Sequence, residues 1–148
     1  MMRESSVDKY HEREAGLKIE NKWDLQVFEC AKFYRCDWQL MRNGKHLAFA
    51  EYKFSTKKIK EKGEHYWINL SKIMFAESLI MISGKPWFLF VEFPEGIFYY
   101  QLDYPVHPFF EITRFVKKDE DGKYSKQPCA ILPIKEFSKL DEDKTSPI

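Results

Sequence analysis

The chain has 148 residues, of which 44% are hydrophobic and 17% aromatic, and its formal net charge is +1. This length suits one domain with its own core, and this composition excludes intrinsic disorder, collagen and linker-rich architectures. The small net charge also excludes a protein that coats nucleic acid simply by being a polycation. We therefore expect a single domain over residues 1–148.

The sequence also gives expectations about the compartment. Its longest apolar stretch, residues 73–82, is much shorter than the roughly 20 residues of a membrane span. The charged N-terminus lacks the apolar run of a secretory signal. Three cysteines without a CxxC pair favour reduced thiols, and four scattered histidines give no zinc spacing. These features predict a soluble, cytoplasmic protein that makes no membrane contact.

The first predicted element is a helix over about residues 7–17, weakened near its end by Gly16. One stripe of this helix is formed by positions three or four residues apart. It consists of Val7, Tyr10, Glu14 and Leu17. A carboxylate on an inward helix face is costly unless it has a partner or a cation. Glu14 is therefore a candidate site residue.

An extended segment at residues 22–29 and a β-hairpin come next. Two β-rich runs flank an Asn-Gly pair at 43–44, which is the strongest short-range hairpin signal. Glu51 and Lys53 lie on one face of the second arm, and two residues of strand span only about 6.6 Å. If the hairpin brings Asp37 of the first arm alongside, two carboxylates and an ammonium occupy one small volume.

An exposed basic loop is predicted at residues 57–65. From residue 42 to residue 72, eight Lys and Arg against three Glu give a local charge of +5. A helix then begins at Asn69 or Ser71 and ends near Ser83, before Gly84. Because this helix is apolar almost all round, we expect it to be central and buried.

The remaining chain predicts two strands and a mixed C-terminal region. Residues 86–93 and 96–102 read as strands joined by a tight turn. A charged loop at 117–126, a short strand at 129–134 and a polar tail from about Lys139 follow.

The two carboxylates and the lysine suit a divalent metal site. Carboxylates forced together repel unless a cation neutralises them. Mg²⁺ takes oxygen ligands and is usually held by one or two carboxylates, and the backbone carbonyl of Tyr52 adds a further ligand. A metal-bound water loses a proton more readily and attacks a phosphodiester, while Lys53 orients that water or neutralises the phosphate.

The arrangement of Asp37, Glu51-x-Lys53 and the surrounding elements resembles the PD-(D/E)xK nuclease superfamily over about residues 6–102. The resemblance implies an α/β fold with a restriction-endonuclease-like core, in which a central mixed β-sheet is flanked by helices in the order αβββαββ. Cys36 stands before Asp37 where the superfamily motif has proline.

The resemblance also implies the residue roles. Asp37 and Glu51 would bind Mg²⁺, with Mn²⁺ as a substitute, and Lys53 would be the catalytic lysine. A glutamate on the first helix would complete the site; Glu14 is our choice because it interrupts the apolar stripe. Its alternatives are Glu12 and Glu20.

The implied activity is Mg²⁺-dependent hydrolysis of phosphodiester bonds in DNA by an endonuclease, with RNA and a homodimer left open. Basic side chains would bind the nucleic-acid backbone. These are Lys57, Lys58, Lys60, Lys62 and Lys72. One alternative is a catalytically silent module of the same fold that binds nucleic acid or a protein. Another is a protein-interaction domain whose exposed aromatic surface meets a partner. The charges would then be incidental and would form a solvated sheet face with weak ion pairs.

Overall fold

The computed structural model describes residues 6–31, 36–102, 111–118 and 124–148, with side chains described for 7–31, 36–102 and 128–148. A six-stranded sheet has the order β1-β2-β3-β5-β6-β9. Its strands are β1 (Gln26–Glu29), β2 (Trp38–Arg42), β3 (Lys45–Phe54), β5 (Trp87–Phe93), β6 (Gly96–Leu102) and β9 (Ser138–Lys139). The β3–β5 pair is parallel and the other pairs are antiparallel. The predicted α/β class with a mixed central sheet is therefore confirmed.

The hairpin predicted from the Asn-Gly pair joins β2 to β3. Asn43 and Gly44 both have positive φ, 51° and 75°, as a two-residue hairpin turn of the primed type requires. The register pairs Trp38 with Ala50 and Arg42 with Lys45. Among the described residues, the first arm is shorter than predicted, because β2 begins only at Trp38. Residues 32–35, which were predicted to belong to this arm in part, lie outside the described residues.

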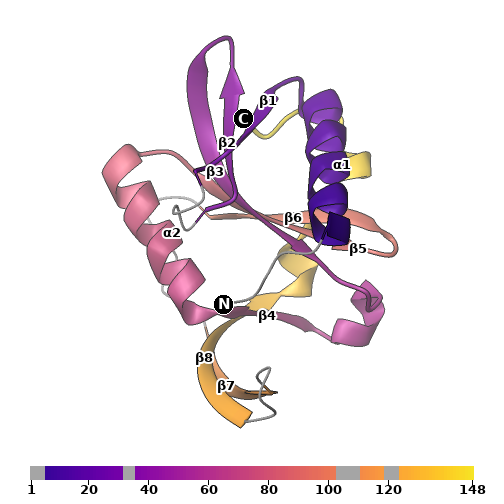
Figure 1. The fold of residues 1–148 in the computed structure, drawn as a ribbon, viewed down its shortest axis with the longest axis vertical. Helices are drawn as coiled ribbons and strands as arrows, with labels where there is room; N and C mark the ends of the chain where they lie inside the picture. The colour runs from indigo at the N-terminus through magenta and orange to yellow at the C-terminus, as the bar shows by residue number, and fades with distance from the viewer. Residues whose placement is uncertain (1–5, 32–35, 103–110, 119–123) are drawn as a thin grey trace.

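Helix α1 (Ser6–Trp23) lies on one face of the central sheet (Figure 1). It continues past Gly16, so the predicted end at residue 17 is wrong. The predicted inward stripe is also wrong: Glu14 is exposed, and Val7, Tyr10 and Leu17 are more than half exposed. The buried side chains of α1 are those of Glu12, Ala15, Ile19 and Trp23. The longer helix explains the difference, because Ile19 and Trp23 set the direction that packs on the sheet.

Helix α2 (Leu70–Ser83) lies on the opposite face of the sheet (Figure 1). Its predicted boundaries are confirmed, since Asn69 caps the first turn and Gly84 adopts the left-handed conformation after the last. The predicted burial is wrong. Only Ile73, Ala76 and Ile80 are buried, whereas Met74, Met81 and Ile82 are more than half exposed. One stripe of α2 packs inward and the rest faces away from the core.

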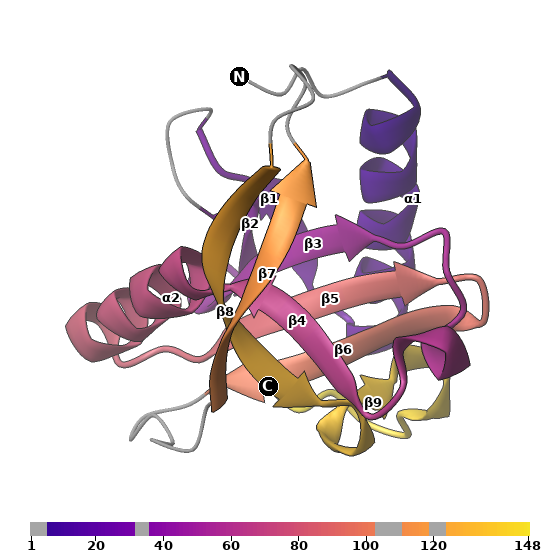
Figure 2. The ribbon, with the colours of Figure 1, turned by 90° about the horizontal axis from the view of Figure 1, so that it is seen from below.

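A second sheet, not predicted from the sequence, has the order β4-β8-β7 and lies on the α2 face of the central sheet (Figure 2). Its strands are β4 (His65–Asn69), β7 (Glu111–Lys118) and β8 (Tyr124–Pro133). The predicted basic loop contains a 3₁₀ turn, Ile59–Lys62, before β4. The predicted charged loop at 117–126 overlaps the ends of β7 and β8, while residues 119–123 lie outside the described part.

The predicted polar tail is docked onto the core. Leu140 is buried, and the Asp143 carboxylate accepts hydrogen bonds from Trp23 Nε1 (2.8 Å) and from the Tyr99 hydroxyl (2.8 Å). Arg42 Nη1 donates to the carbonyl of Ile148 (3.0 Å). The C-terminal residues therefore help to close the α1 layer. Over the residues that can be placed, neither helix combines the length and the apolar character needed to cross a membrane.

Candidate active site

The candidate site lies where β3 passes the start of β2. Because strand side chains alternate, Ala50 and Tyr52 face α1, and Glu51 and Lys53 face α2 and the second sheet. Lys53 Nζ lies 3.6 Å from Glu51 Oε1. The two side chains that were expected to share one face do share it.

Asp37 was expected within a strand, but it lies directly before β2. Two hydrogen bonds hold it beside β3, and a third joins it to Cys30, directly after β1. Its N–H donates to the Ala50 carbonyl (3.1 Å), and its own carbonyl accepts from the Cys30 N–H (2.9 Å). Its carboxylate Oδ2 accepts from the Tyr52 N–H (2.8 Å). The hairpin thus brings the Asp37 carboxylate next to the residue that follows Glu51.

Cys36 occupies the position before Asp37 where the superfamily motif has proline. Its thiol donates to the Trp38 carbonyl (3.2 Å) and lies 3.1 Å from the thiol of Cys30. Proline restricts a backbone by fixing φ, whereas here local hydrogen bonds restrain the same segment. All three cysteines are free thiols, as expected from their spacing.

Glu51 has the most unusual environment of the candidate residues. Only 2% of its side chain is exposed. Oε1 lies 2.9 Å from Lys72 Nζ, whereas the buried Oε2 has no hydrogen-bond partner. Burial raises the pKa of the Glu51 carboxyl, the nearby Asp37 charge raises it further, and Lys53 and Lys72 act in the opposite direction. A carboxylate in this position is costly to ionise unless a cation neutralises it.

The three glutamates weighed for the α1 position differ in their surroundings. Glu14 is exposed, and Glu20 Oε2 accepts a hydrogen bond from the Val27 N–H (3.0 Å), which ties α1 to β1. Glu12 is buried, with 6% of the residue exposed. It lines a cavity of about 280 Å³ together with Glu29 and Trp38. Glu29 of β1 pairs with Trp38 of β2, and Trp38 directly follows Asp37 in the chain.

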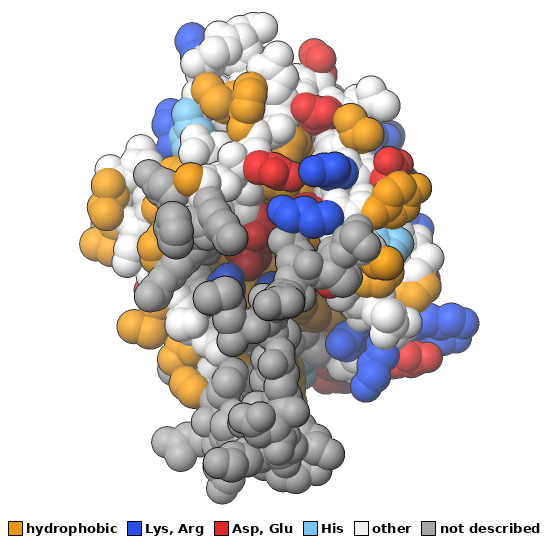
Figure 3. All heavy atoms as spheres, viewed as in Figure 1, with side chains coloured by type: hydrophobic (Ala, Val, Ile, Leu, Met, Phe, Trp, Pro, Cys, Tyr) orange, Lys and Arg blue, Asp and Glu red, His pale blue; other side chains and the backbone are white. Residues whose placement is uncertain are grey.

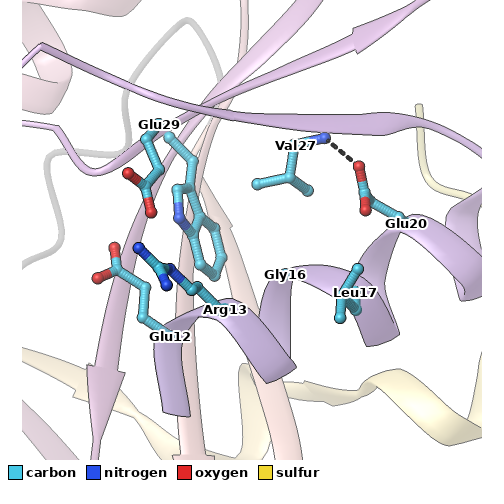
Figure 4. Close-up of a pocket in the computed structure, with 8 residues that line it drawn as sticks. Glu12, Arg13, Gly16, Leu17, Glu20, Val27 and Glu29 are labelled. Carbon is cyan, nitrogen blue, oxygen red and sulfur yellow. Dashed lines mark hydrogen bonds between the residues drawn. The ribbon is translucent and has the colours of Figure 1, made fainter. Parts of the chain in front are cut away.

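A close-up of this cavity shows how its charged residues lie. In Figure 4 the guanidinium of Arg13 lies between the carboxylates of Glu12 and Glu29. Lys9 Nζ is 3.7 Å from Glu12 Oε2. Of the three glutamates, Glu12 is therefore the one that the structure buries beside the strand end carrying Asp37. In the sequence, the spacing of Glu12 to Ile19 and Trp23 would place all three on one side of a helix. This spacing becomes informative only when the helix is known to continue to Trp23.

The basic residues expected to contact nucleic acid fall into two groups. Lys57, Lys58 and Lys60 are exposed on the turn after β3, and Lys62 Nζ lies 5.9 Å from the centre of the Tyr66 ring. Lys72 differs from these because it reaches the buried Glu51. Figure 3 shows Lys and Arg side chains over this turn, and others beside acidic side chains around a recess in the middle of that face.

The donor set suits a metal that needs few protein ligands. Among the side chains that the structure describes, no three His, Cys, Asp or Glu residues converge closely enough to hold an ion by themselves. Mg²⁺ is usually held by one or two carboxylates and retains several waters. Glu51 fits such an ion, because its Oε2 has no hydrogen-bond partner and the charge of Asp37 raises the pKa of its carboxyl group.

A mixed sheet that carries an aspartate before one hairpin arm and Glu-x-Lys on the other defines a protein of the PD-(D/E)xK nuclease class. The chain belongs to the family described as "Phage putative PDDEXK endonuclease", whose model matches residues 2–140. A search of curated proteins finds no match.

Among solved structures, the chain is similar to Hjc of Archaeoglobus fulgidus, a Holliday junction resolvase from an archaeal hyperthermophile. The sequences are 11% identical, the TM-score is 0.58, and the similarity covers 93% of this chain and 94% of that chain. Because the sequence identity is low, this similarity is evidence about the fold alone. It confirms the restriction-endonuclease-like fold predicted from the sequence.

Proposed function

We propose that this protein is a Mg²⁺-dependent endonuclease that hydrolyses phosphodiester bonds of DNA. The observation that carries the proposal is the buried Glu51 carboxyl group. Its Oε2 has no hydrogen-bond partner, the charge of Asp37 raises its pKa, and Lys53 projects from the same face of the strand. A solvated sheet face with surface ion pairs would leave this carboxylate exposed. The membership in a PDDEXK endonuclease family supports the same conclusion.

The Asp37 and Glu51 carboxylates and the Tyr52 carbonyl would hold the ion. The Ala50 carbonyl points towards β2, because it accepts a hydrogen bond from the Asp37 N–H. Carbonyls two residues apart on a strand point to the same side, so the Tyr52 carbonyl also points to this edge of β3, at a level beyond the end of β2. When bound there, Mg²⁺ would make a water more acidic and would stabilise negative charge on the phosphate oxygens.

Lys53 is suited to contact the substrate. Its side chain is 43% exposed, and its Nζ lies 3.6 Å from Glu51 Oε1, so the ammonium group lies between the buried carboxylate and the solvent. From there it would bind a phosphate oxygen or hold the attacking water. Lys57, Lys58 and Lys60 are exposed on the turn that follows β3. They would contact backbone phosphates without reading bases.

A cleavage assay tests the proposal. The protein is incubated with single-stranded, double-stranded and four-way branched DNA, and with RNA of the same sequence, in Mg²⁺, Mn²⁺ or EDTA. We expect DNA cleavage in either metal and none in EDTA, with activity restored when Mg²⁺ is added in excess. Salt-sensitive DNA binding without cleavage in both metals would instead indicate the catalytically silent binding module.

We further propose that Glu12, rather than Glu14, is the α1 glutamate of the site. Replacing Glu12 with glutamine is expected to lower the cleavage rate by about 10- to 100-fold, as for residues that support metal ligands. Glu14→Gln serves as the matched control on the same helix and is expected to keep wild-type activity, because Glu14 is exposed. Equal rates for Glu12→Gln and wild type, with both proteins folded by circular dichroism, would contradict this assignment.

A further inference from the structure

Lys72 makes a contact that the proposed reaction does not require. Its Nζ lies 2.9 Å from Glu51 Oε1, closer than that of Lys53 at 3.6 Å. Both ammonium groups share this one oxygen, and Oε2 is left without a hydrogen-bond partner. Lys72 is therefore the nearest cation to the buried carboxylate among the residues with described side chains.

The position of Lys72 is not explained by the stability of α2. It lies in the first turn of the helix, where the positive end of the helix dipole disfavours a cation. The buried Ile73 and Ala76 fix the rotation of α2 on the sheet and so direct Lys72 towards β3. Because the helix end disfavours this ammonium group, the contact with Glu51 is the interaction that favours it there.

The contact also separates Lys72 from the lysines that follow β3. A lysine that binds phosphates extends into solvent, as Lys57 and Lys58 do. The Lys72 side chain is only 34% exposed and ends at a carboxylate that is 2% exposed. A charge-assisted hydrogen bond of this length holds a side chain in one orientation.

We infer that Lys72 is a positioning residue that neutralises Glu51 while the site holds no metal, and that its charge opposes the binding of Mg²⁺ at the same carboxylate. This inference rests on the proposed function. Two cations near one carboxylate repel each other. The presence of one therefore makes the binding of the other to the same carboxylate less favourable. Lys72 would thus limit the affinity of the site for Mg²⁺ and stabilise the metal-free protein.

The experiment measures Mg²⁺ binding without DNA, by calorimetric titration and by the increase in Tm on adding Mg²⁺. Lys72→Met keeps most of the length of the side chain and removes its charge. We expect it to bind Mg²⁺ about tenfold more tightly than wild type. It should also have a lower Tm in EDTA and a larger increase in Tm with Mg²⁺. Lys72→Arg keeps the charge and should resemble wild type, as should Lys57→Met on the exposed turn.

The outcomes separate the inference from the proposed function. If wild type binds Mg²⁺ and Lys72→Met binds it equally or more weakly, Lys72 has only a structural role and the inference is wrong. If neither wild type nor the variant binds Mg²⁺ or Mn²⁺, the proposed function itself is wrong. Should Lys72→Met fail to fold, Lys72→Gln, which keeps a donor for Oε1 without the charge, is expected to show the same gain in affinity, and unchanged affinity would overturn the inference.

Discussion

Replacing Glu51 with glutamine is expected to abolish cleavage and, at the same time, to stabilise the metal-free protein. The activity should fall by at least about a thousandfold, as when a group that stabilises transition-state charge is removed. Glutamine has nearly the same shape but no negative charge, so the metal would lose a carboxylate ligand. The rate is measured in Mg²⁺ on the substrate that wild type cleaves best.

The gain in stability follows from the raised pKa of the Glu51 carboxyl. Its pKa in the folded protein lies above the ordinary value of 4.5, because burial and Asp37 outweigh the two lysines. A carboxyl with a raised folded-state pKa stabilises the fold below its unfolded-state pKa, and this contribution is lost as the pH rises through the folded-state pKa. At neutral pH the ionised Glu51 therefore destabilises the metal-free protein, and glutamine avoids that penalty.

Denaturant unfolding in EDTA at pH 5 and pH 8 measures this effect. We expect Glu51→Gln to increase the free energy of unfolding by about 1 kcal/mol at pH 8 and by less at pH 5. Glu61→Gln, a change at an exposed carboxylate, should show no such difference. Added Mg²⁺ should stabilise wild type and leave Glu51→Gln nearly unchanged. A Glu51→Gln protein less stable than wild type at pH 8 in EDTA would show that the Lys72 ion pair outweighs burial.

Replacing Lys53 with alanine is expected to lower the single-turnover cleavage rate by about 100- to 1,000-fold, because the variant lacks the ammonium group that would stabilise charge at the phosphate. Folding should change little, since Lys53 is 43% exposed and Lys72 still pairs with Glu51. Rates are measured at saturating DNA, so that binding and chemistry are separated.

Lys57→Ala is the matched control for Lys53→Ala, since both changes remove one lysine near the exit of β3. We expect Lys57→Ala to weaken DNA binding for all sequences and to reduce its salt dependence by about one phosphate contact, with an almost unchanged rate at saturation. If Lys53→Ala cleaves as fast as wild type, the mechanism proposed for this lysine is excluded.

The features predicted correctly from the sequence depend on neighbouring residues. Asn43 and Gly44 adopt positive φ because their own chemistry allows it, and this sets the turn that leads into β3. The alternation of a strand then places Glu51 and Lys53 on one face whatever lies around them. Asn69 and Gly84 mark the ends of α2 for equally local reasons.

The features that were missed depend on residues distant in the chain. The β4–β8 pairing joins Asn69 to Cys129, and no local pattern identifies such partners. The apolar composition of α2 did not predict its exposed side, because burial depends on how much surface the sheets cover. The contact of Lys72 with Glu51 depends on the rotation of α2 on the sheet, which cannot be read from the helix alone.

By itself, the sequence determined the hairpin and the Asp37 and Glu51-x-Lys53 pattern, since turn chemistry and strand alternation act over a few residues. The class of fold followed from the family resemblance that this pattern carries. Only the tertiary structure decided which carboxylates are buried. It buries Glu12 and leaves Glu14 exposed, and it gives Glu51 two lysines on one oxygen and none on the other. These outcomes depend on how the helices and sheets pack together, and packing sets both the loss of solvent and the distances between charges.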